Sequence, residues 1–506
     1  MDKNQDQSSS RQVKKIVIVG GGSSGWMTAC LLNARLNSDA KNPIKISLIE
    51  APDIPVIGVG EATVPSIRRT LQAIGISEQD FMRGADATFK SLIRFENWNA
   101  GEHFDHPFDR RERPQTDAAA LSWLAGSKGG GNSFSTKFSV LSNTSSRMLA
   151  PKAIGWPEYQ STFPYAYHLD AVKLGQLLTR FGTERGIEHI LARIEKVEMT
   201  EAGDIAALIS ESGEQFTADL FIDCTGFSAH LAGQTMAETR DYSKHLLCDR
   251  AVTLSIPYDV YRPDHILPYT SANARSAGWL WDINLQSRRS LGYVHSSSHI
   301  SAEAAETEMR RHEGPHTEGL EAKHIRFKTY KRIKSWHRNC IAIGLSDGFV
   351  EPLESTGLYM MQFAAQSVAD ILRLNPVFTP ATTSQFNRLM QSLFDEIFGY
   401  VALHYLTSNR RDSIFWRDAT DPSRVPDGLK FLMGEWKGRP PHDMDLLSTH
   451  RLFSLESYEY LLFGMGYVSD CAAQSQSAHF SLQETLDKCY AKLPLHENWL
   501  AKTLAQ

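Results

Sequence analysis

The sequence predicts a mixed α/β (α+β) fold in which a discontinuous, strand-rich unit is followed by a mainly helical region. Short β-branched and apolar runs that end at glycines, at residues 15–19 and 220–224, are typical of buried parallel strands. Such strand and glycine signals fall within residues 15–100 and 160–374. Residues 375–506 mostly follow a helical pattern, with clusters of aromatic residues.

Two segments lie outside this pattern. Residues 101–159 are rich in Gly, Ser and Pro, which predicts a loop-rich insertion of the kind that often borders a substrate site. Residues 1–14 are polar and lack the apolar core of a signal peptide, so we expect a disordered tail and, by default, a cytoplasmic protein. No apolar run approaches the roughly 18 residues that a membrane-spanning helix needs.

Composition and charge exclude several classes of function. The 506 residues carry a formal net charge of -5, which gives no reason to expect nucleic acid or an acidic membrane as a partner. Six cysteines are scattered without a CxxC pair, so we expect reduced thiols rather than a disulfide framework or a zinc site. His312 and His316 are separated by a Gly-Pro pair that forbids one helical face, and we predict no metal site.

The first strand runs into a glycine-rich turn that predicts dinucleotide binding. Gly20, Gly22 and Gly25 fit GxGxxG, in which the glycines allow a tight turn, close approach of the backbone to a pyrophosphate, and helix–strand packing. Glu50 ends the second strand, where an acid can bind the ribose hydroxyls. This motif alone does not distinguish FAD from NAD.

Two later features favour FAD. Residues 220–226 form another buried strand with a glycine turn, and Asp347 follows a third strand, where its carboxylate could reach a flavin's ribityl chain. A second GxGxxG fingerprint for a nicotinamide cofactor is missing. We therefore expect a separate enzyme to reduce the flavin.

Residues 344–358 hold an unusual group of polar side chains at a predicted helix start. The apolar strand 340–343 leads into this segment, and an apolar-periodic helix, 358–374, leaves it. A helix N-terminus attracts anions, so the segment predicts a small anion beside the Glu354 carboxylate. From the residues alone, Glu354 is also compatible with a helix-capping acid and Lys90 with a solvated lysine.

Several motifs together resemble the flavin-dependent halogenases, and the tryptophan halogenase family in particular. Phe349, Pro352, Ser355 and Gly357 fit the family pattern FxxPxxSxG. The other matching segments extend over most of the chain: 20–26, 58–65, 87–90, 95–98, 168–170, 223–227, 279–283 and 415–417. In place of the proline that follows WxWxI in the family, this chain has Asn284, which we interpret as a local change of turn.

The resemblance implies a flavin monooxygenase-type FAD-binding fold with an added, mostly helical substrate lobe. Reduced FAD (FADH2) from a separate flavin reductase, O2 and chloride or bromide would generate hypohalous acid, which travels through a tunnel to the substrate. Lys90 matches the lysine that holds this acid or forms a haloamine with it, and Glu354 matches the active-site glutamate. Thr356 and Gly357 match the halide contacts.

We expect the flavin site to combine residues of the glycine motif with residues carried over from the family. The predicted FAD contacts are Gly20, Gly21, Gly22, Ser24, Gly25, Glu50, Ala51, Ile54, Ile57, Val59, Ala62, Leu345, Asp347 and Leu358. Trp279 and Trp281 alternate, so a strand would place both on one side, either as core or near the flavin. Thr356 and Gly357 should face the halide and flavin, and Glu354 the substrate.

The substrate region departs from the enzymes that act on free tryptophan. Residues 452–460 lack their tryptophan pair but keep Phe453, Tyr458 and Tyr460, which could stack on an aromatic ring or simply belong to the core. We therefore predict an indole-like substrate: free tryptophan, indole, a substituted indole or a larger tryptophan-containing molecule. An aromatic hydroxylase and a non-catalytic flavoprotein are the alternatives, and a homodimer is left open.

Overall fold

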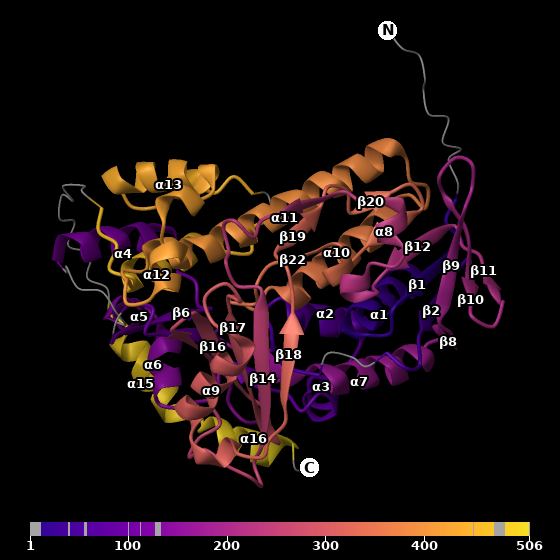
Figure 1. The fold of residues 1–506 in the computed structure, drawn as a ribbon. Coiled ribbons are helices and arrows are strands. Elements are labelled where there is room, and N and C mark those ends of the chain that lie inside the picture. Colours follow the sequence, from indigo (N-terminus) through magenta and orange to yellow (C-terminus); the bar gives the residue numbers. More distant parts are fainter. Residues whose placement is uncertain are drawn as a thin grey trace.

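The computed structural model describes residues 12–38, 41–54, 58–99, 101–111, 113–126, 133–448, 450–469 and 481–504. Within these residues, a six-stranded sheet carries the predicted nucleotide-binding strands in the order β20-β21-β12-β1-β2-β8 (Figure 1). The pairs β1–β2, β1–β12, β2–β8 and β12–β21 are parallel. Its strands are β1 (Lys15–Val19), β2 (Lys45–Glu50), β8 (Glu188–Leu191), β12 (Leu220–Asp223), β20 (Trp336–His337) and β21 (Cys340–Ala342).

The two faces of this sheet pack against different layers because successive side chains of a strand point to opposite sides. Ile16 and Ile18 of β1 belong to the main hydrophobic core, together with Trp26 of helix α1 (Ser23–Asn37). Val17 and Val19 pack instead against a small antiparallel sheet of β9 (Ile194–Met199), β10 (Ile205–Ser210) and β11 (Gln215–Phe216). Helices α7 (Ala171–Thr183) and α10 (Gly357–Leu374) flank α1.

A second sheet, with seven strands, lies apart from the nucleotide-binding sheet (Figure 1). Trp279 and Trp281 are both buried on its strand β16, with ring centroids 6.2 Å apart, as predicted for alternate residues of a strand. Among the described residues the strands are, in order, β18 (Ala322–Arg326), β14 (Arg250–Pro257), β17 (Arg288–His295), β16 (Gly278–Asn284), β15 (Thr270–Arg275), β5 (Leu92–Glu96) and β6 (His103–Pro107).

Two three-stranded sheets and several helices complete the strand-rich part. One sheet consists of β3 (Gly60–Ala62), β7 (Ala166–Asp170) and β4 (Thr88–Lys90), and the other of β13 (Thr239–Asp241), β19 (Tyr330–Arg332) and β22 (Gly348–Phe349). The helices are α2 (Ile67–Ile74), α3 (Glu78–Gly84), α8 (Ala232–Thr235) and α9 (Ala302–Glu313).

Helices dominate the chain after residue 375. The long helix α11 (Pro380–Thr407) packs on α10 and crosses the upper part of the view in Figure 1. It is followed by α12 (Ile414–Ala419), α13 (Asp427–Gly438), α14 (Leu455–Gly464), α15 (Gln483–Lys492) and α16 (His496–Leu504). In the described ranges, no helix is both long and apolar enough to cross a membrane.

Two segments outside the main sheets have more regular structure, where they are described, than the sequence led us to expect. Residues 101–159 contain β6 and the helices α4 (Arg113–Gly126), α5 (Ser133–Phe138) and α6 (Val140–Ser146). Aromatic residues of α4 and α5 bury against α14 in one cluster with Tyr460, and Val140 of α6 packs against α15. Of the predicted disordered tail, residues 1–11 lie outside the described residues. Val13 is buried and its backbone N–H donates to the carbonyl oxygen of Pro376 at 2.7 Å.

Candidate active site

The glycines in the turn between β1 and α1 have two different roles. Gly20 and Gly25 pack closely against the backbone, whereas Gly22 faces open space. Gly20 has φ +116°, and a Cβ there would lie 2.3 Å from the Cys224 carbonyl oxygen. A Cβ on Gly25 would lie 1.8 Å from the Gly20 carbonyl oxygen. A Cβ on Gly22 would meet no atom within 4 Å. The space beside Gly22 therefore fits the pyrophosphate of a dinucleotide.

The other predicted flavin residues lie on several elements, of which two contact this turn. The Ser24 hydroxyl donates to the Ile343 carbonyl oxygen at 3.3 Å, which joins the turn to the segment that contains Leu345. A Cβ on Gly21 would touch the Glu50 carboxylate, whose Oε2 lies 2.9 Å from Nε2 of His189. Ala51 and Ile54 follow β2, and Val59 directly precedes β3, which ends at Ala62. Leu358 is the second residue of α10, and Ile57 lies outside the described residues.

Asp347 has a protein partner in this structure. Its Oδ1 accepts a hydrogen bond from Nζ of the buried Lys331 at 2.8 Å, and both side chains are nearly inaccessible to solvent. Because a carboxylate can accept several hydrogen bonds, this ion pair leaves room for a further contact. A contact between Asp347 and the ribityl chain remains a prediction.

Lys90 ends strand β4 and is completely buried, so its interpretation as a solvated lysine is wrong. Its Nζ donates to the Thr63 carbonyl oxygen at 3.1 Å and to the Ser355 hydroxyl at 2.8 Å. Neither partner is charged. Burial lowers the pKa of Lys90 to about 7, although the charge of Glu354 acts in the opposite direction. Lys90 is therefore an amine that can change its protonation state near neutral pH.

Glu354 lies between two histidines from distant parts of the chain. Nδ1 of His106, on β6, is 2.9 Å from its Oε2, and Nε2 of His404, on α11, is 2.9 Å from its Oε1. Burial disfavours the charged carboxylate, but the His106 charge and hydrogen bond, followed by those of His404, lower its pKa to about 2. Because this carboxylate binds histidines and α10 begins only at Gly357, the capping interpretation is wrong.

One tight turn connects the amine to the carboxylate. Ser355, which binds Lys90, follows Glu354 directly and adopts a left-handed conformation with φ +59°. This strain is of order 1–3 kcal/mol and is typical of functional sites. The turn thereby places the Lys90 amine, bound to Ser355, near the Glu354 carboxylate. An amine can hold an electrophile by a hydrogen bond, and a carboxylate beside it can act as a base.

The next two residues fit a small anion. Helix α10 begins at Gly357, one residue before the predicted helix 358–374. The Thr356 hydroxyl is buried, and it has no hydrogen-bond partner in the described part of the chain. A Cβ on Gly357 would meet no atom within 4 Å. An orphaned hydroxyl and open space at a helix N-terminus together favour a bound anion such as halide.

Sequence reasoning missed four side chains around this turn. His106, Tyr400 and His404 meet Glu354 or one another only after folding. Glu351 is fully buried and accepts a hydrogen bond from the Tyr405 hydroxyl at 2.6 Å. Burial raises the pKa of Glu351 to about 7. The cluster of aromatic residues at 394–405 was the one sequence signal that pointed to this part of α11.

Two of the three predicted substrate residues lie close to the Glu354 group. Phe453 stacks on Tyr400 with ring centroids 3.8 Å apart and lies 6.2 Å from the His106 ring. Tyr458 packs edge-on against Tyr400 at 5.0 Å. Tyr460 belongs to a different cluster, because residues two apart on a helix point about 200° away from each other. We therefore leave Tyr460 out of the proposed site.

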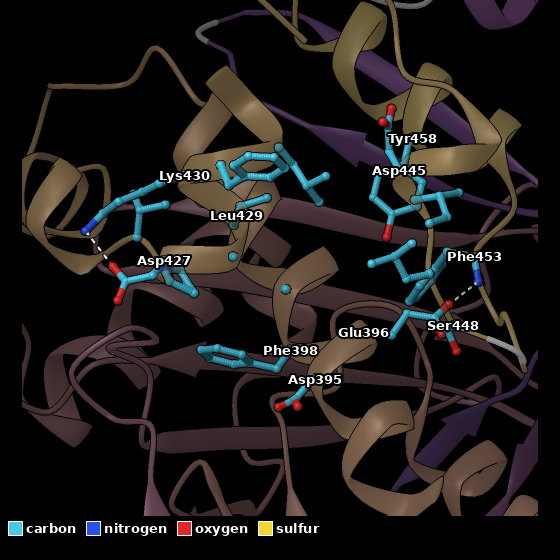
Figure 2. Close-up of a pocket in the computed structure, with 18 of the residues that line it drawn as sticks. Asp395, Glu396, Phe398, Asp427, Leu429, Lys430, Asp445, Ser448, Phe453 and Tyr458 are labelled. Atoms are coloured by element: carbon cyan, nitrogen blue, oxygen red, sulfur yellow. Dashed lines mark hydrogen bonds and ion pairs between the residues drawn. The ribbon is translucent and has the colours of Figure 1, made fainter. Parts of the chain in front are cut away.

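Phe453 and Tyr458 also line a cavity of about 840 Å³ between α11, α13 and residues 444–453 (Figure 2). Glu396 lies on its wall and accepts the backbone N–H groups of Leu452 and Phe453 at 2.8 and 3.0 Å, which anchors this segment to α11. The residues that line the cavity do not include Lys90 or Glu354. Phe453 thus lines this cavity and also contacts Tyr400 and His106 beside Glu354.

Known proteins are similar to this chain over most of its length. The tryptophan halogenase family model matches residues 15–479. Tryptophan 6-halogenase SttH of Streptomyces toxytricini is 32% identical over 90% of this chain and 90% of its own length. Tryptophan 7-halogenase RebH of Lentzea aerocolonigenes is 32% identical over 98% of this chain and 97% of its own.

Solved structures give the same result. The crystal structure of a tryptophan halogenase from Shewanella frigidimarina is 33% identical and superimposes with a TM-score of 0.88, covering 98% of both chains. The fold prediction is thus confirmed. The chain belongs to the tryptophan halogenase family and is a flavin-dependent halogenase.

Proposed function

We propose that this halogenase uses FADH2, O2 and chloride or bromide to halogenate an indole-like aromatic ring. The observation that carries this proposal is the turn that binds Lys90 through Ser355 and presents the neighbouring Glu354 between two histidines. An aromatic hydroxylase would not need this pairing of a buried amine and a carboxylate. Relatives that act on tryptophan support an indole-type substrate.

Each residue has a distinct task in this proposal. When bound, the flavin supplies the oxidising chemistry that combines O2 with halide. Thr356 and Gly357 hold the halide at the start of α10. The Lys90 ammonium donates a hydrogen bond to hypohalous acid, which increases the electrophilicity of the halogen. Glu354 stabilises the cationic ring that forms on substitution and accepts its proton.

Product analysis tests this function directly. The protein is incubated with FAD, NADH, a separate flavin reductase, bromide and a panel of indoles, including free tryptophan and tryptophan-containing peptides. We expect brominated products with the isotope doublet of bromine, and turnover that depends on halide. Hydroxylated products without bromination on every indole would overturn the proposal in favour of an aromatic hydroxylase.

Substitutions in the glycine turn should affect either flavin binding or folding, depending on which glycine is changed. Gly22→Ala adds a Cβ that meets no protein atom, so the apoprotein should keep its melting temperature. FAD affinity should fall by about tenfold or more, because the methyl group occupies the space for the pyrophosphate. Gly25→Ala is the matched comparison and should reduce the yield of folded protein, since its Cβ would overlap the Gly20 carbonyl. Unchanged FAD affinity of Gly22→Ala, measured by fluorescence titration, would contradict this assignment.

The lowered pKa of Lys90 predicts a pH dependence with a definite sign. If the ammonium is the working form, the rate of bromination should fall as pH rises through about 7, by about tenfold per pH unit above it. Initial rates are measured from about pH 6 to 9 at saturating indole, with flavin occupancy checked at each pH. A rate that instead rises towards a plateau above pH 7 would show that the neutral amine, and hence a haloamine, carries the halogen.

A further inference from the structure

The cavity between α11 and α13 has the size of a binding site and borders the residues around Glu354. Its volume of about 840 Å³ lies within the range of roughly 300–1,000 Å³ that is typical of sites enclosing a drug-sized molecule. Phe453 and Tyr458 form part of its wall and also pack on Tyr400. Phe453 lies 6.2 Å from the His106 ring, whose Nδ1 is 2.9 Å from the Glu354 carboxylate. Aromatic side chains of the cavity wall thus belong to the same group of contacts as this carboxylate.

Glycines leave part of this cavity open. Gly399 lies inside the long helix α11 and lines the cavity, and a Cβ there would meet no atom within 4 Å. Gly428, near the start of α13, also lines the cavity and has the same open space. Glycine destabilises the interior of a helix relative to alanine. Because no neighbouring protein atom requires a glycine at position 399, this residue keeps space free although it weakens the helix.

Apolar side chains gather at the mouth of the cavity. Phe431 of α13 and, from the segment after α13, Met444 and Leu447 line the cavity, yet they are 70, 69 and 90% exposed. They are three of the four most exposed large hydrophobic residues in the described part of the chain; the fourth, Leu374, ends α10 and lies outside the lining. Apolar side chains that are exposed together around a cavity are typical of a ligand-binding surface.

Most charged side chains of the walls already have partners. Lys430 pairs with Asp427 at 3.2 Å, and Arg439 pairs with Asp445 at 2.6 Å. Charged groups that bind one another have less to offer a charged ligand. The walls therefore present mainly apolar surface, including the buried Leu429, which lies in the middle of the view in Figure 2.

We propose that this cavity binds a long, uncharged apolar substituent of the substrate, so that the preferred substrate is an indole with a hydrocarbon chain and not free tryptophan. The proposal rests on the proposed halogenation of an indole-like ring. A second copy of the chain or another protein could also cover the apolar mouth, but neither explains the open space beside Gly399. Burial of each additional CH2 group removes apolar surface from water, so affinity should rise with chain length.

A series of 3-alkylindoles tests the cavity in the FAD-loaded protein. 3-Methylindole, 3-propylindole and 3-hexylindole carry their chains where tryptophan has its side chain. Dissociation constants are measured by isothermal titration calorimetry without NADH or reductase, so that no turnover occurs. We expect affinity to rise by about two- to threefold per added CH2, with a heat-capacity change that becomes more negative as the chain lengthens. Affinity that does not rise with chain length, or tighter binding of tryptophan than of 3-propylindole, would overturn the proposal.

Two helix glycines provide a matched pair of variants. Gly399→Leu places a side chain in the cavity, so the gain in affinity from 3-methylindole to 3-hexylindole should shrink by at least about fivefold. Gly434→Leu adds the same side chain to an exposed site of α13 outside the lining, and its affinities should stay within about twofold of the wild type. Both variants should keep or raise the melting temperature, because leucine favours a helix over glycine. Equal effects of the two variants would contradict the cavity assignment.

Substitutions at the mouth distinguish a small ligand from a protein partner. Phe431→Ser and Leu447→Ser remove exposed side chains, so folding should be unaffected, and both should weaken binding of 3-hexylindole more than that of 3-methylindole. Leu374→Ser, which is similarly exposed but outside the lining, is the control. If chain length has no effect and the wild type forms dimers that the two mouth variants abolish, the apolar mouth joins two copies of the chain and the proposal is wrong.

Bromination assays separate failure of this proposal from failure of the proposed function. We expect kcat/KM to rise along the 3-alkylindole series. A wild type that brominates indole with no preference for longer chains would refute the role of the cavity and leave the halogenation of indoles standing. Binding that strengthens with chain length, without bromination of any indole, would refute the proposed function while supporting the apolar site.

Discussion

Lys90→Met should abolish bromination, with a loss of at least about 1000-fold in kcat, while FAD affinity stays within about threefold of the wild type. Met fills nearly the same volume but cannot donate a hydrogen bond to hypohalous acid. Neither hydrogen-bond partner of Lys90, Thr63 or Ser355, is a predicted flavin contact, so flavin binding should remain. Product formation and FAD titration are measured on the same preparation.

The same substitution should not destabilise the protein. Lys90 is buried beside two neutral oxygens, and its lowered pKa means that the folded state binds fewer protons than the unfolded state between about pH 7 and 10. Stability should therefore rise with pH through this window in the wild type. Met removes a buried amine, so Lys90→Met should be equally or more stable below pH 7 and should lack this rise.

Lys152 provides a matched control for a buried lysine with a structural role. Its Nζ donates to the Glu78 carboxylate at 2.7 Å, and both side chains are buried. Lys152→Met leaves the buried Glu78 carboxylate without its cationic partner and should cost about 3–5 kcal/mol of stability, with bromination per folded molecule unchanged. If Lys90→Met instead lowered the melting temperature as much as Lys152→Met and lost FAD, Lys90 would be a structural residue.

The sequence predicted the parts of the site that depend on local geometry. A β-branched strand followed by Gly20, Gly22 and Gly25 forms its turn largely from the conformational freedom of glycine. The start of α10 after Thr356 likewise follows from a change of periodicity within a few residues. Lys90 and Glu354 were found through their family motifs. Their burial and their hydrogen-bond partners could not be derived from the residues next to them in the sequence.

The surroundings of Glu354 could not be predicted, because they come from tertiary packing. His106 lies 248 residues before Glu354 in the sequence, and His404 lies in the last turn of the long helix α11. The error for Tyr460 has a similar origin, since the substrate-facing side of α14 depends on which neighbour covers each face. Helical spacing alone separates Tyr458 from Tyr460 but does not say which of them faces Tyr400.

Glu354→Gln should reduce kcat for bromination by about 100- to 1000-fold and change FAD affinity by less than about threefold. An amide keeps the shape of the side chain but neither stabilises a cationic ring nor accepts its proton. It also leaves His106 and His404 without their anionic partner. Glu351→Gln is the control: burial raises the pKa of this acid to about 7, so an amide closely resembles its protonated form, and kcat near pH 6 should change little.

The pH profile of Glu354→Gln shows whether its lower activity comes from the loss of the carboxylate or from general damage to the site. Burial lowers the pKa of Lys90 and the charge of Glu354 raises it, so removing that charge should lower the pKa of Lys90 further. The residual activity of Glu354→Gln should therefore decline at a lower pH than that of the wild type, whose midpoint we expect at about 7. An unchanged midpoint together with a large loss of kcat would mean that Glu354 acts on the ring without influencing Lys90. A loss of FAD binding would mean that the turn itself had collapsed.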